Sequence, residues 1–279
     1  MAADVSSDAA AAAVEAPEVR GAPEPQPKRR LLYTRQFAVV YLILAAALIG
    51  TGAGVVIAKY GVSVKGGSGP WSSWQPNGNP SAKTSEIAQR VGGAYRLPSG
   101  HQLLDVYSKR LTVPVSTGSG QATIPIAAVA IQGTKGSADK ISLVSDSDSR
   151  LFQLCGNGSA CAIGEGKASI PRGQIVRREA LELALYTFKY VPGISHVIAF
   201  MPPPPGSQPS TLLYFDKADL RSQLSTPLTA TITPKTPLPT TITATQGAQI
   251  DKITLPHIYK FALQQTQLGQ AVLVLAPAA

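Results

Sequence analysis

The stretch FAVVYLILAAALIGTGAGVVIA, residues 37–58, decides how the chain is organised, because it holds no charged residue and no proline. As an α-helix it would rise roughly 33 Å, which is enough to cross a hydrocarbon core of about 30 Å. A single segment can cross only as a helix, since hydrocarbon offers no hydrogen-bond partner to a free backbone group. We therefore predict one transmembrane helix over residues 37–58.

A cleaved signal peptide is the alternative interpretation of this stretch. Such peptides carry an apolar region of about 7–15 residues near the amino terminus, followed by small residues at the cleavage site. Here residues 1–36 come first, and residues 55–57 continue the apolar run beyond the small residues 51–53. The pattern therefore favours an anchor that stays in the protein.

The orientation follows from the basic residues that flank the stretch, because the more basic side normally stays in the cytoplasm. Those residues are Lys28, Arg29, Arg30 and Arg35 before it, and Lys59 and Lys65 after it. We expect a plasma-membrane protein that crosses the bilayer once, with a cytoplasmic amino terminus. The carboxy-terminal domain is then extracytoplasmic.

Four small residues recur at every fourth position of the predicted span: Ala46, Gly50, Gly54 and Ala58. They fall on one helix face, where small side chains let a second helix approach closely. This face predicts a homodimer or a packed partner helix. The alternative is that small residues are simply common in an alanine-rich span.

Composition divides the rest of the chain into three parts. Residues 1–36 include few large apolar side chains, which predicts a disordered cytoplasmic tail. Residues 59–82 are rich in Gly, Ser and Pro and are expected to form a linker. Its two tryptophans, Trp71 and Trp74, could anchor at the membrane interface, stack on a sugar ring or pack on the folded domain; we favour packing.

The surplus of positive over negative charge lies outside the predicted tail and span. The net charge is +9, and residues 1–36 hold five basic and five acidic side chains, so the whole surplus follows the span. The surplus is compatible with contact to lipid head groups, an anionic wall polymer or another envelope protein, and the alternative, which we favour, is a charged surface that only keeps the domain dispersed. The predicted topology argues against nucleic acid. Richness in Ala, Gly and Pro is typical of a bacterial protein, here of the cell envelope.

Residues 83–279 are predicted to form an α+β domain, with a mixed β-sheet and a few packed helices. Helices are expected over 84–95, 172–191 and 217–224, and over 250–265 with an interruption at Pro256. Strands are expected over 102–107, 111–115, 122–131, 141–144, 150–155, 194–201, 211–215 and 271–275. The Thr- and Pro-rich segment 226–246 is open to O-glycosylation, and its alternation from residue 228 suggests an edge strand.

The two cysteines, Cys155 and Cys161, enclose a short segment with two glycines and an asparagine. In an oxidising compartment this arrangement predicts a disulfide. A redox pair would need closer C-x-x-C spacing and a following helix. The three histidines lie far apart in the sequence without a neighbour at ligand spacing, so we expect no metal site and no cofactor.

Catalytic motifs are not recognisable, and the catalytic residues therefore stay unknown. A G-x-S-x-G elbow is absent, and the S-x-x-K match at residues 137–140 lies in a predicted loop. His196 alternates with large apolar residues, which favours a histidine satisfied within the fold. Candidate acids are Asp146, Asp148, Glu165, Glu179 and Glu182, but the sequence places no cleft around them.

The function predicted from these observations is a membrane-anchored binding or assembly module without catalysis. The alternative is an enzyme that acts on cell wall or lipid through a site assembled from dispersed residues. A deep pocket that gathers His196, an acid and a Ser or Tyr would favour the enzyme.

Overall fold

The structure is a computed structural model, and it describes residues 70–109, 112–117, 120–133, 140–267 and 270–278. The tail 1–36 and the predicted span 37–58 lie outside these residues, as does its small-residue face of Ala46, Gly50, Gly54 and Ala58. Within the described ranges, no helix combines the length and the apolar character needed to cross a membrane. The description below concerns only the folded unit that these residues form.

Nine strands form one mixed sheet, in the order β1-β5-β6-β7-β8-β9-β3-β2, with β4 paired to β3. They are β1 (Asp105–Lys109), β2 (Thr112–Thr117), β3 (Gly120–Gln132), β4 (Ile141–Ser145), β5 (Ser149–Cys155), β6 (His196–Phe200), β7 (Thr211–Asp216), β8 (Ile258–Gln265) and β9 (Ala271–Pro277). The pairs β5/β6 and β3/β9 are parallel, and the other pairs are antiparallel. The predicted mixed sheet is confirmed.

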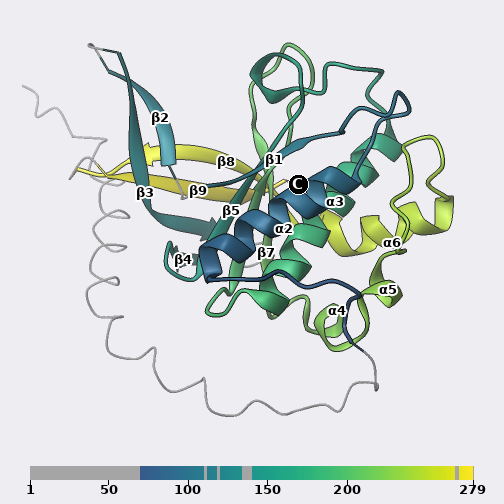
Figure 1. Cartoon of the computed structure of the whole chain (residues 1–279). Coiled ribbons are helices and arrows are strands. Elements are labelled where there is room, and N and C mark those ends of the chain that lie inside the picture. Colours follow the sequence, from purple (N-terminus) through teal and green to yellow (C-terminus); the bar gives the residue numbers. More distant parts are fainter. Residues whose placement is uncertain (1–69, 110–111, 118–119, 134–139, 268–269, 279) are drawn as a thin grey trace, which may run out of the picture. The chain divides into compact units, whose positions relative to one another are not determined.

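Helices cover one face of this sheet. They are α2 (Pro80–Ala94), α3 (Ile170–Tyr190), α4 (Arg221–Ser225), α5 (Leu228–Thr231) and α6 (Ala244–Thr254), with the short 3₁₀ turns η3 (Ser159–Cys161) and η4 (Leu255–His257). The helices α2 and α3 lie side by side in Figure 1, and α6 packs against α3. The predicted combination of a sheet with a few packed helices is therefore also confirmed.

Local chemistry explains where the three longer helices begin. The side chain of Asn79 accepts a hydrogen bond from the amide of Ala82 in α2, and that of Ser169 accepts one from Arg172 in α3. Thr243 and Gln246 form a reciprocal capping box at the start of α6. Each cap satisfies amides that the helix itself leaves unpaired, typically stabilising the helix by about 1 kcal/mol.

The sheet separates two hydrophobic cores, because alternate residues of a strand face opposite sides. In β6, Val197 and Ala199 pack under the helices, in what we call the helix-side core, whereas Ile198 faces the other side. That second cluster, which we call the inner core, takes a residue from each strand from β3 to β9. Its buried members are Ile126, Val129, Ile131, Val144, Leu151, Ile198, Leu212, Tyr214, Tyr259, Ala271, Leu273 and Leu275.

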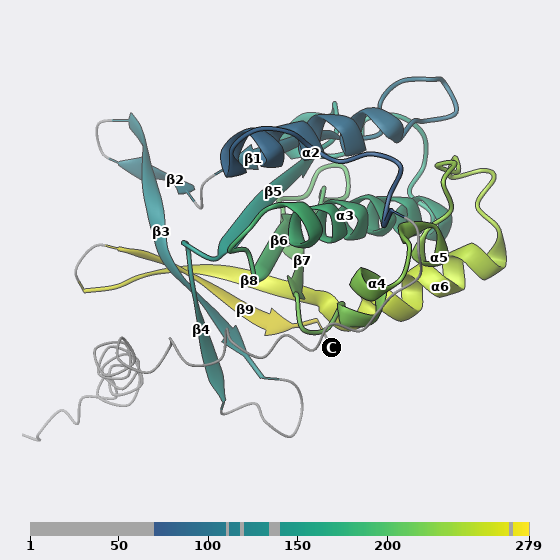
Figure 2. The ribbon, with the colours of Figure 1, turned by 60° about the horizontal axis from the view of Figure 1, so that its bottom comes forward.

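The inner core exists because the sheet curls on itself. Val144 of β4 and Leu151 of β5 belong to the same cluster, although their strands stand far apart in the order of the sheet. β3 pairs in parallel with β9 and antiparallel with β4, and Figure 2 shows these strands at the end of the sheet away from α2 and α3. The strands at one end thereby cover the apolar face of those at the other, where the described residues place no helix.

Two predictions of local structure were wrong. Residues 250–265 do not form one helix, because α6 ends at Thr254 and residues 258–265 form β8, which pairs with β9. Pro256 lacks an amide proton and cannot continue the hydrogen bonding of α6. The expected edge strand from residue 228 is instead α5, since Leu228 and Ile232, four residues apart, both pack into the helix-side core.

Candidate functional site

The helix α3 buries charged side chains in the middle of the helix-side core. Arg178 is 3% exposed and Glu179 is 0% exposed. The Arg178 guanidinium donates a hydrogen bond of 2.6 Å to the carbonyl oxygen of Thr233. Buried charges lower folding stability unless they are paired. Their presence on this helix therefore suggests a role other than packing.

Glu182 lies one turn further along α3 and is joined to Tyr95, the residue that ends α2. The Tyr95 hydroxyl donates a hydrogen bond of 2.6 Å to a carboxylate oxygen of Glu182, and the Arg178 guanidinium lies 5.5 Å from the centre of the Tyr95 ring. Burial raises the pKa of Glu182, while the Tyr95 hydrogen bond and the charge of Arg178 act against that rise. Burial outweighs these opposing effects, so the pKa of Glu182 stays above its usual value.

Glu179 differs, because neither of its buried carboxyl oxygens has a hydrogen-bond partner among the described residues. Burial, with repulsion from Glu182, raises its pKa well above the usual value of 4.5. The neutral, protonated carboxyl is therefore the form that this site favours. Unpaired buried groups of this kind are uncommon and concentrate at functional sites.

A cavity of about 430 Å³, which we call the Glu182 cavity, opens beside these groups. Its walls come from α2, α3, residues 72–74 and the segment 228–236. Aromatic, charged and polar side chains all line it, among them Trp74, Arg90, Glu182, Tyr186, Leu228 and Thr233. A cavity of this size that mixes apolar walls with a few polar groups is typical of a small-ligand site.

The two tryptophans of the predicted linker lie on this side of the domain. Trp71 is 8% exposed, contacts the rings of Tyr186 and Tyr190 edge-on, and donates a hydrogen bond of 3.2 Å to the carbonyl oxygen of Gln223. Trp74 is half-buried and carries the Arg90 guanidinium 5.5 Å from its ring centre. Both rings thus pack on the domain, as we favoured, and Trp74 also lines the Glu182 cavity.

The cysteine pair forms the predicted bond: the sulfur atoms of Cys155 and Cys161 are 2.05 Å apart. The bond closes the loop after β5, where a Cβ atom on Gly156 would lie only 2.6 Å from the Cα atom of Ile163. Glycine is required there by this close approach of two backbone segments. The loop lies outside the lining of the Glu182 cavity.

His196, at the start of β6, lies beside two acids and a tyrosine. Its Nδ1 atom lies 2.8 Å from the Tyr214 hydroxyl, and its Nε2 atom lies 3.6 Å from a carboxylate oxygen of Asp148. A carboxylate oxygen of Asp216 is 3.7 Å from Nδ1. Both ring nitrogens of His196 have partners within the fold, as its alternation with apolar residues predicts. The group does not line the Glu182 cavity.

The other candidate residues are scattered. The exposed His101 pairs with the half-buried Glu165 at 3.0 Å, and Asp146 lines a separate cavity at the amino-terminal end of α2. Ser137 of the S-x-x-K match lies outside the described residues. In the described part of the chain, no group of three His, Cys, Asp or Glu side chains has the geometry of a metal site.

The sequence interpretation missed Tyr95 and Arg90 as members of the site. The available signal was the pair Glu179 and Glu182 inside the most apolar helix of the domain, where acids are out of place.

Comparisons of the chain with protein-family models, with curated proteins and with solved structures found no match.

Proposed function

We propose that the protein is a binding module of the bacterial cell envelope, anchored by residues 37–58, that holds an anionic wall polymer in the Glu182 cavity. The observation that carries this proposal is the Arg90 guanidinium, which lies over the Trp74 ring on the cavity wall. A planar guanidinium held in place binds carboxylate or phosphate groups better than a mobile ammonium does.

The charges around the cavity support an anionic ligand. Arg90 is exposed and has no ion pair within 4 Å among the described residues, so it can pair with a ligand, although its charge also acts on Glu182. The one acid that lines the cavity, Glu182, is held by the Tyr95 hydroxyl and has a raised pKa, which weakens its repulsion of an anion. The net charge of +9, all of it after the predicted span, acts in the same direction.

The polar side chains of the cavity suit a polymer built from sugars or polyols. Gln89, Thr229, Thr233 and Thr236 supply amide and hydroxyl groups, and Trp74 and Tyr186 supply aromatic surface. Hydroxyl-rich ligands need both kinds of contact, because each sugar ring has polar edges and less polar faces. The cavity offers both within one small volume.

The test is binding of a soluble, phosphate-bearing wall polymer to the full chain in detergent, measured by calorimetry at two salt concentrations. We expect Arg90→Gln to weaken binding about tenfold, because charge-assisted hydrogen bonds contribute about 1.5–3 kcal/mol. The matched control is Arg221→Gln, an exposed arginine outside the cavity. Equal loss in both variants would mean that only the overall charge matters, and preferential binding to anionic lipid vesicles would replace the wall polymer with a membrane surface.

The raised pKa of Glu182 favours a second candidate, an enzyme that acts on the same class of polymer. A protonated carboxyl group in a cavity can serve as a general acid. The variant Glu182→Gln separates the two functions: the binding module keeps its affinity and shows no turnover in either form. Release of reducing ends by the wild-type chain, lost in Glu182→Gln, would establish the enzyme.

The proposed location also has its own test. If residues 37–58 anchor the chain with the amino terminus in the cytoplasm, a reporter fused after Ala279 is exposed outside the membrane. Cysteine crosslinking at Gly50 and Gly54 tests the proposed helix-packing face. A carboxy-terminal reporter that is active only in the cytoplasm would reverse the orientation.

A further inference from the structure

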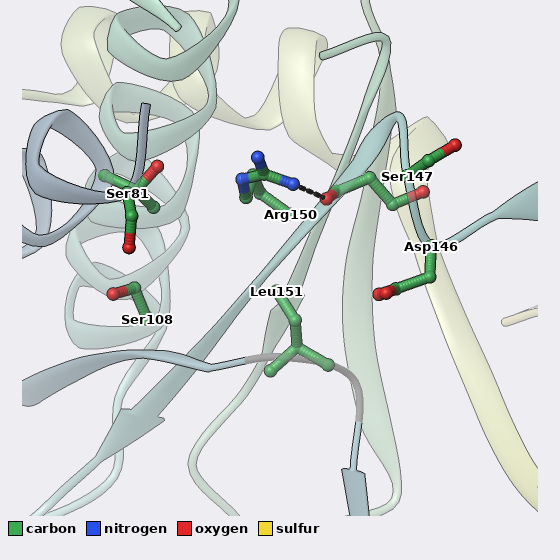
Figure 3. A pocket seen from close by; sticks show the side chains of 8 residues that line it. Ser81, Ser108, Asp146, Ser147, Arg150 and Leu151 are labelled. Atoms are coloured by element: carbon green, nitrogen blue, oxygen red, sulfur yellow. Dashed lines mark hydrogen bonds between the residues drawn. The ribbon is translucent and has the colours of Figure 1, made fainter. Parts of the chain in front are cut away.

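A second cavity lies at the amino-terminal end of α2, whereas the Glu182 cavity borders its carboxyl-terminal half. We call it the Arg150 cavity; its volume is about 330 Å³. The first turn of α2, the strand β1 and the turn between β4 and β5 form its walls. Ser81, Ser108, Ser147 and Asp146 line it, together with Arg150 and Leu151, as Figure 3 shows.

Figure 3 shows Arg150 between Ser81 and Ser108 on one side of the cavity and the β4–β5 turn on the other. One of its nitrogen atoms donates a hydrogen bond of 2.7 Å to the carbonyl oxygen of Ser149, which fixes the position of the group. Among the described residues Arg150 has no ion-pair partner. Since a guanidinium has five N–H donors, it keeps donors for a ligand in the cavity.

Asp146 lines the same cavity from the β4–β5 turn, and its carboxylate has no hydrogen-bond or ion-pair partner among the described residues. Its backbone carbonyl oxygen accepts a hydrogen bond from the amide of Ser149, so the turn that carries it is fixed. Asp146 and Arg150 are not within ion-pair distance of each other. The cavity therefore presents a guanidinium group held by the Ser149 carbonyl oxygen and a carboxylate on a hydrogen-bonded turn, and neither has an ion-pair partner among the described residues.

We infer that the Arg150 cavity binds a small zwitterion of the α-amino acid class. The ligand carboxylate pairs with the Arg150 guanidinium, and its ammonium group pairs with the Asp146 carboxylate. Ser81 and Ser108 line the α2 and β1 side of the cavity (Figure 3), and their hydroxyl groups can donate or accept hydrogen bonds. The volume of about 330 Å³ lies at the small end of ligand sites and has room for a single amino acid.

This inference is independent of the wall-polymer proposal, because the two cavities share no lining residue. The experiment uses the full chain in detergent and three probes at equal ionic strength: glycine, acetate and methylammonium. We expect saturable binding of glycine, and binding of the two singly charged probes at least about tenfold weaker. Saturation-transfer NMR measures all three.

Two variants test the assigned contacts. Arg150→Gln and Asp146→Asn should each weaken glycine binding about tenfold, and Asp146→Asn should leave acetate binding unchanged. Arg221→Gln and Asp219→Asn, which alter exposed charges outside the cavity, are the matched controls. If Arg150→Gln fails to fold, Arg150→Lys keeps the charge but lacks the bidentate geometry and should still bind glycine more weakly.

Three results would overturn the inference. They are the absence of saturable glycine binding, acetate binding as tight as glycine binding, and glycine affinity unaffected by Asp146→Asn. The second and third would identify a site for anions only. A wall-polymer affinity unchanged by Arg150→Gln is expected in every case, which keeps this test separate from that of Arg90.

Discussion

The two cores of this domain differ in what they bury. The inner core is made by strands alone, and none of the buried charged side chains of the described residues belongs to it. The helix-side core buries Arg178 and Glu179 and holds Glu182 against Tyr95. Both cores stabilise the same sheet, so stability alone does not explain why only one of them buries charged side chains. The core that accepts the cost of buried charge is the one that borders the Glu182 cavity.

Geometry explains why the charges stand on the helix side. A curled sheet brings every inward side chain close to several others, and a charge there would be surrounded by hydrocarbon. A helix that lies on a sheet has sides that do not face the sheet. On such a side of α3, Glu182 lines the Glu182 cavity beside α2. The inner core thus serves packing alone, whereas the helix-side core also borders the cavity that we propose as a binding site.

The largest effect should come from truncating either core. Leu181 and Leu273 are both 0% exposed, one in each core. We expect Leu181→Ala and Leu273→Ala each to lower the free energy of unfolding by about 2–5 kcal/mol in denaturant titration. Leu255→Ala is the control, because that side chain is 51% exposed and should change stability by less than about 0.5 kcal/mol.

Both truncations should shift the same single transition, because strands such as β6 contribute to both cores. A second transition in Leu273→Ala alone would break the comparison, since the inner core would then unfold separately. Fluorescence reports mainly on the helix-side core, where Trp71 lies, and circular dichroism reports on the whole domain. Coincident curves are the expected result.

A smaller effect concerns the buried acid Glu179. Its pKa is raised in the folded state by burial first and by Glu182 second. The native state therefore keeps a proton that the unfolded state loses, and the stability from this group is complete only below the unfolded pKa. It falls as the pH rises toward the folded pKa, at up to about 1.4 kcal/mol per pH unit.

Glu179→Gln should remove this pH dependence and raise the free energy of unfolding by about 1–3 kcal/mol near pH 8 relative to wild type. The measurement is urea unfolding between pH 4 and pH 9. Glu165→Gln is the contrast: hydrogen bonds from Ser99 and His101 lower the pKa of that carboxyl, so any contribution has the opposite sign. A slope unchanged by Glu179→Gln would mean that this carboxyl is not buried in solution.

The smallest expected effect lies at the polar end of the inner core. Tyr214→Phe removes the hydroxyl that lies 2.8 Å from Nδ1 of His196 and leaves the ring in place. We expect a loss of about 0.5–1.5 kcal/mol in thermal or chemical unfolding. Tyr259→Phe, on a ring packed edge-on against Tyr214, is the matched control. An equal loss in both variants would show that the hydrogen bond between Tyr214 and His196 adds nothing to the free energy of unfolding.

Much of the fold could be predicted, because periodicity is a local property. The strands β5, β6, β7 and β9 and the helix α3 lie within two residues of the predicted ranges at each end. The start of α6 was missed because Thr and Pro dominate the residues before it, although Thr243 and Gln246 carry the spacing of a capping box. Residues 258–265 show no clear alternation, and pairing with β9 along their length makes them a strand.

The candidate site was much less predictable than the fold. The acids Glu179 and Glu182 were recognised only as members of a longer set of candidates. The partner that gives Glu182 its character, Tyr95, is 87 positions away in the sequence. Arg90 gains its significance only from its place over Trp74, and no local pattern encodes that contact.

By itself, the sequence determined the properties that depend on near neighbours: an apolar stretch long enough for a membrane, a positive surplus after it, a closable cysteine loop and most helices and strands. The tertiary structure alone decided which side chains meet. It buried Trp71, joined Glu182 to Tyr95 and left Arg150 and Asp146 unpaired across one cavity. The physical reason is that burial and pairing depend on contacts between distant parts of the chain, which form only when the sheet curls and the helices pack on it.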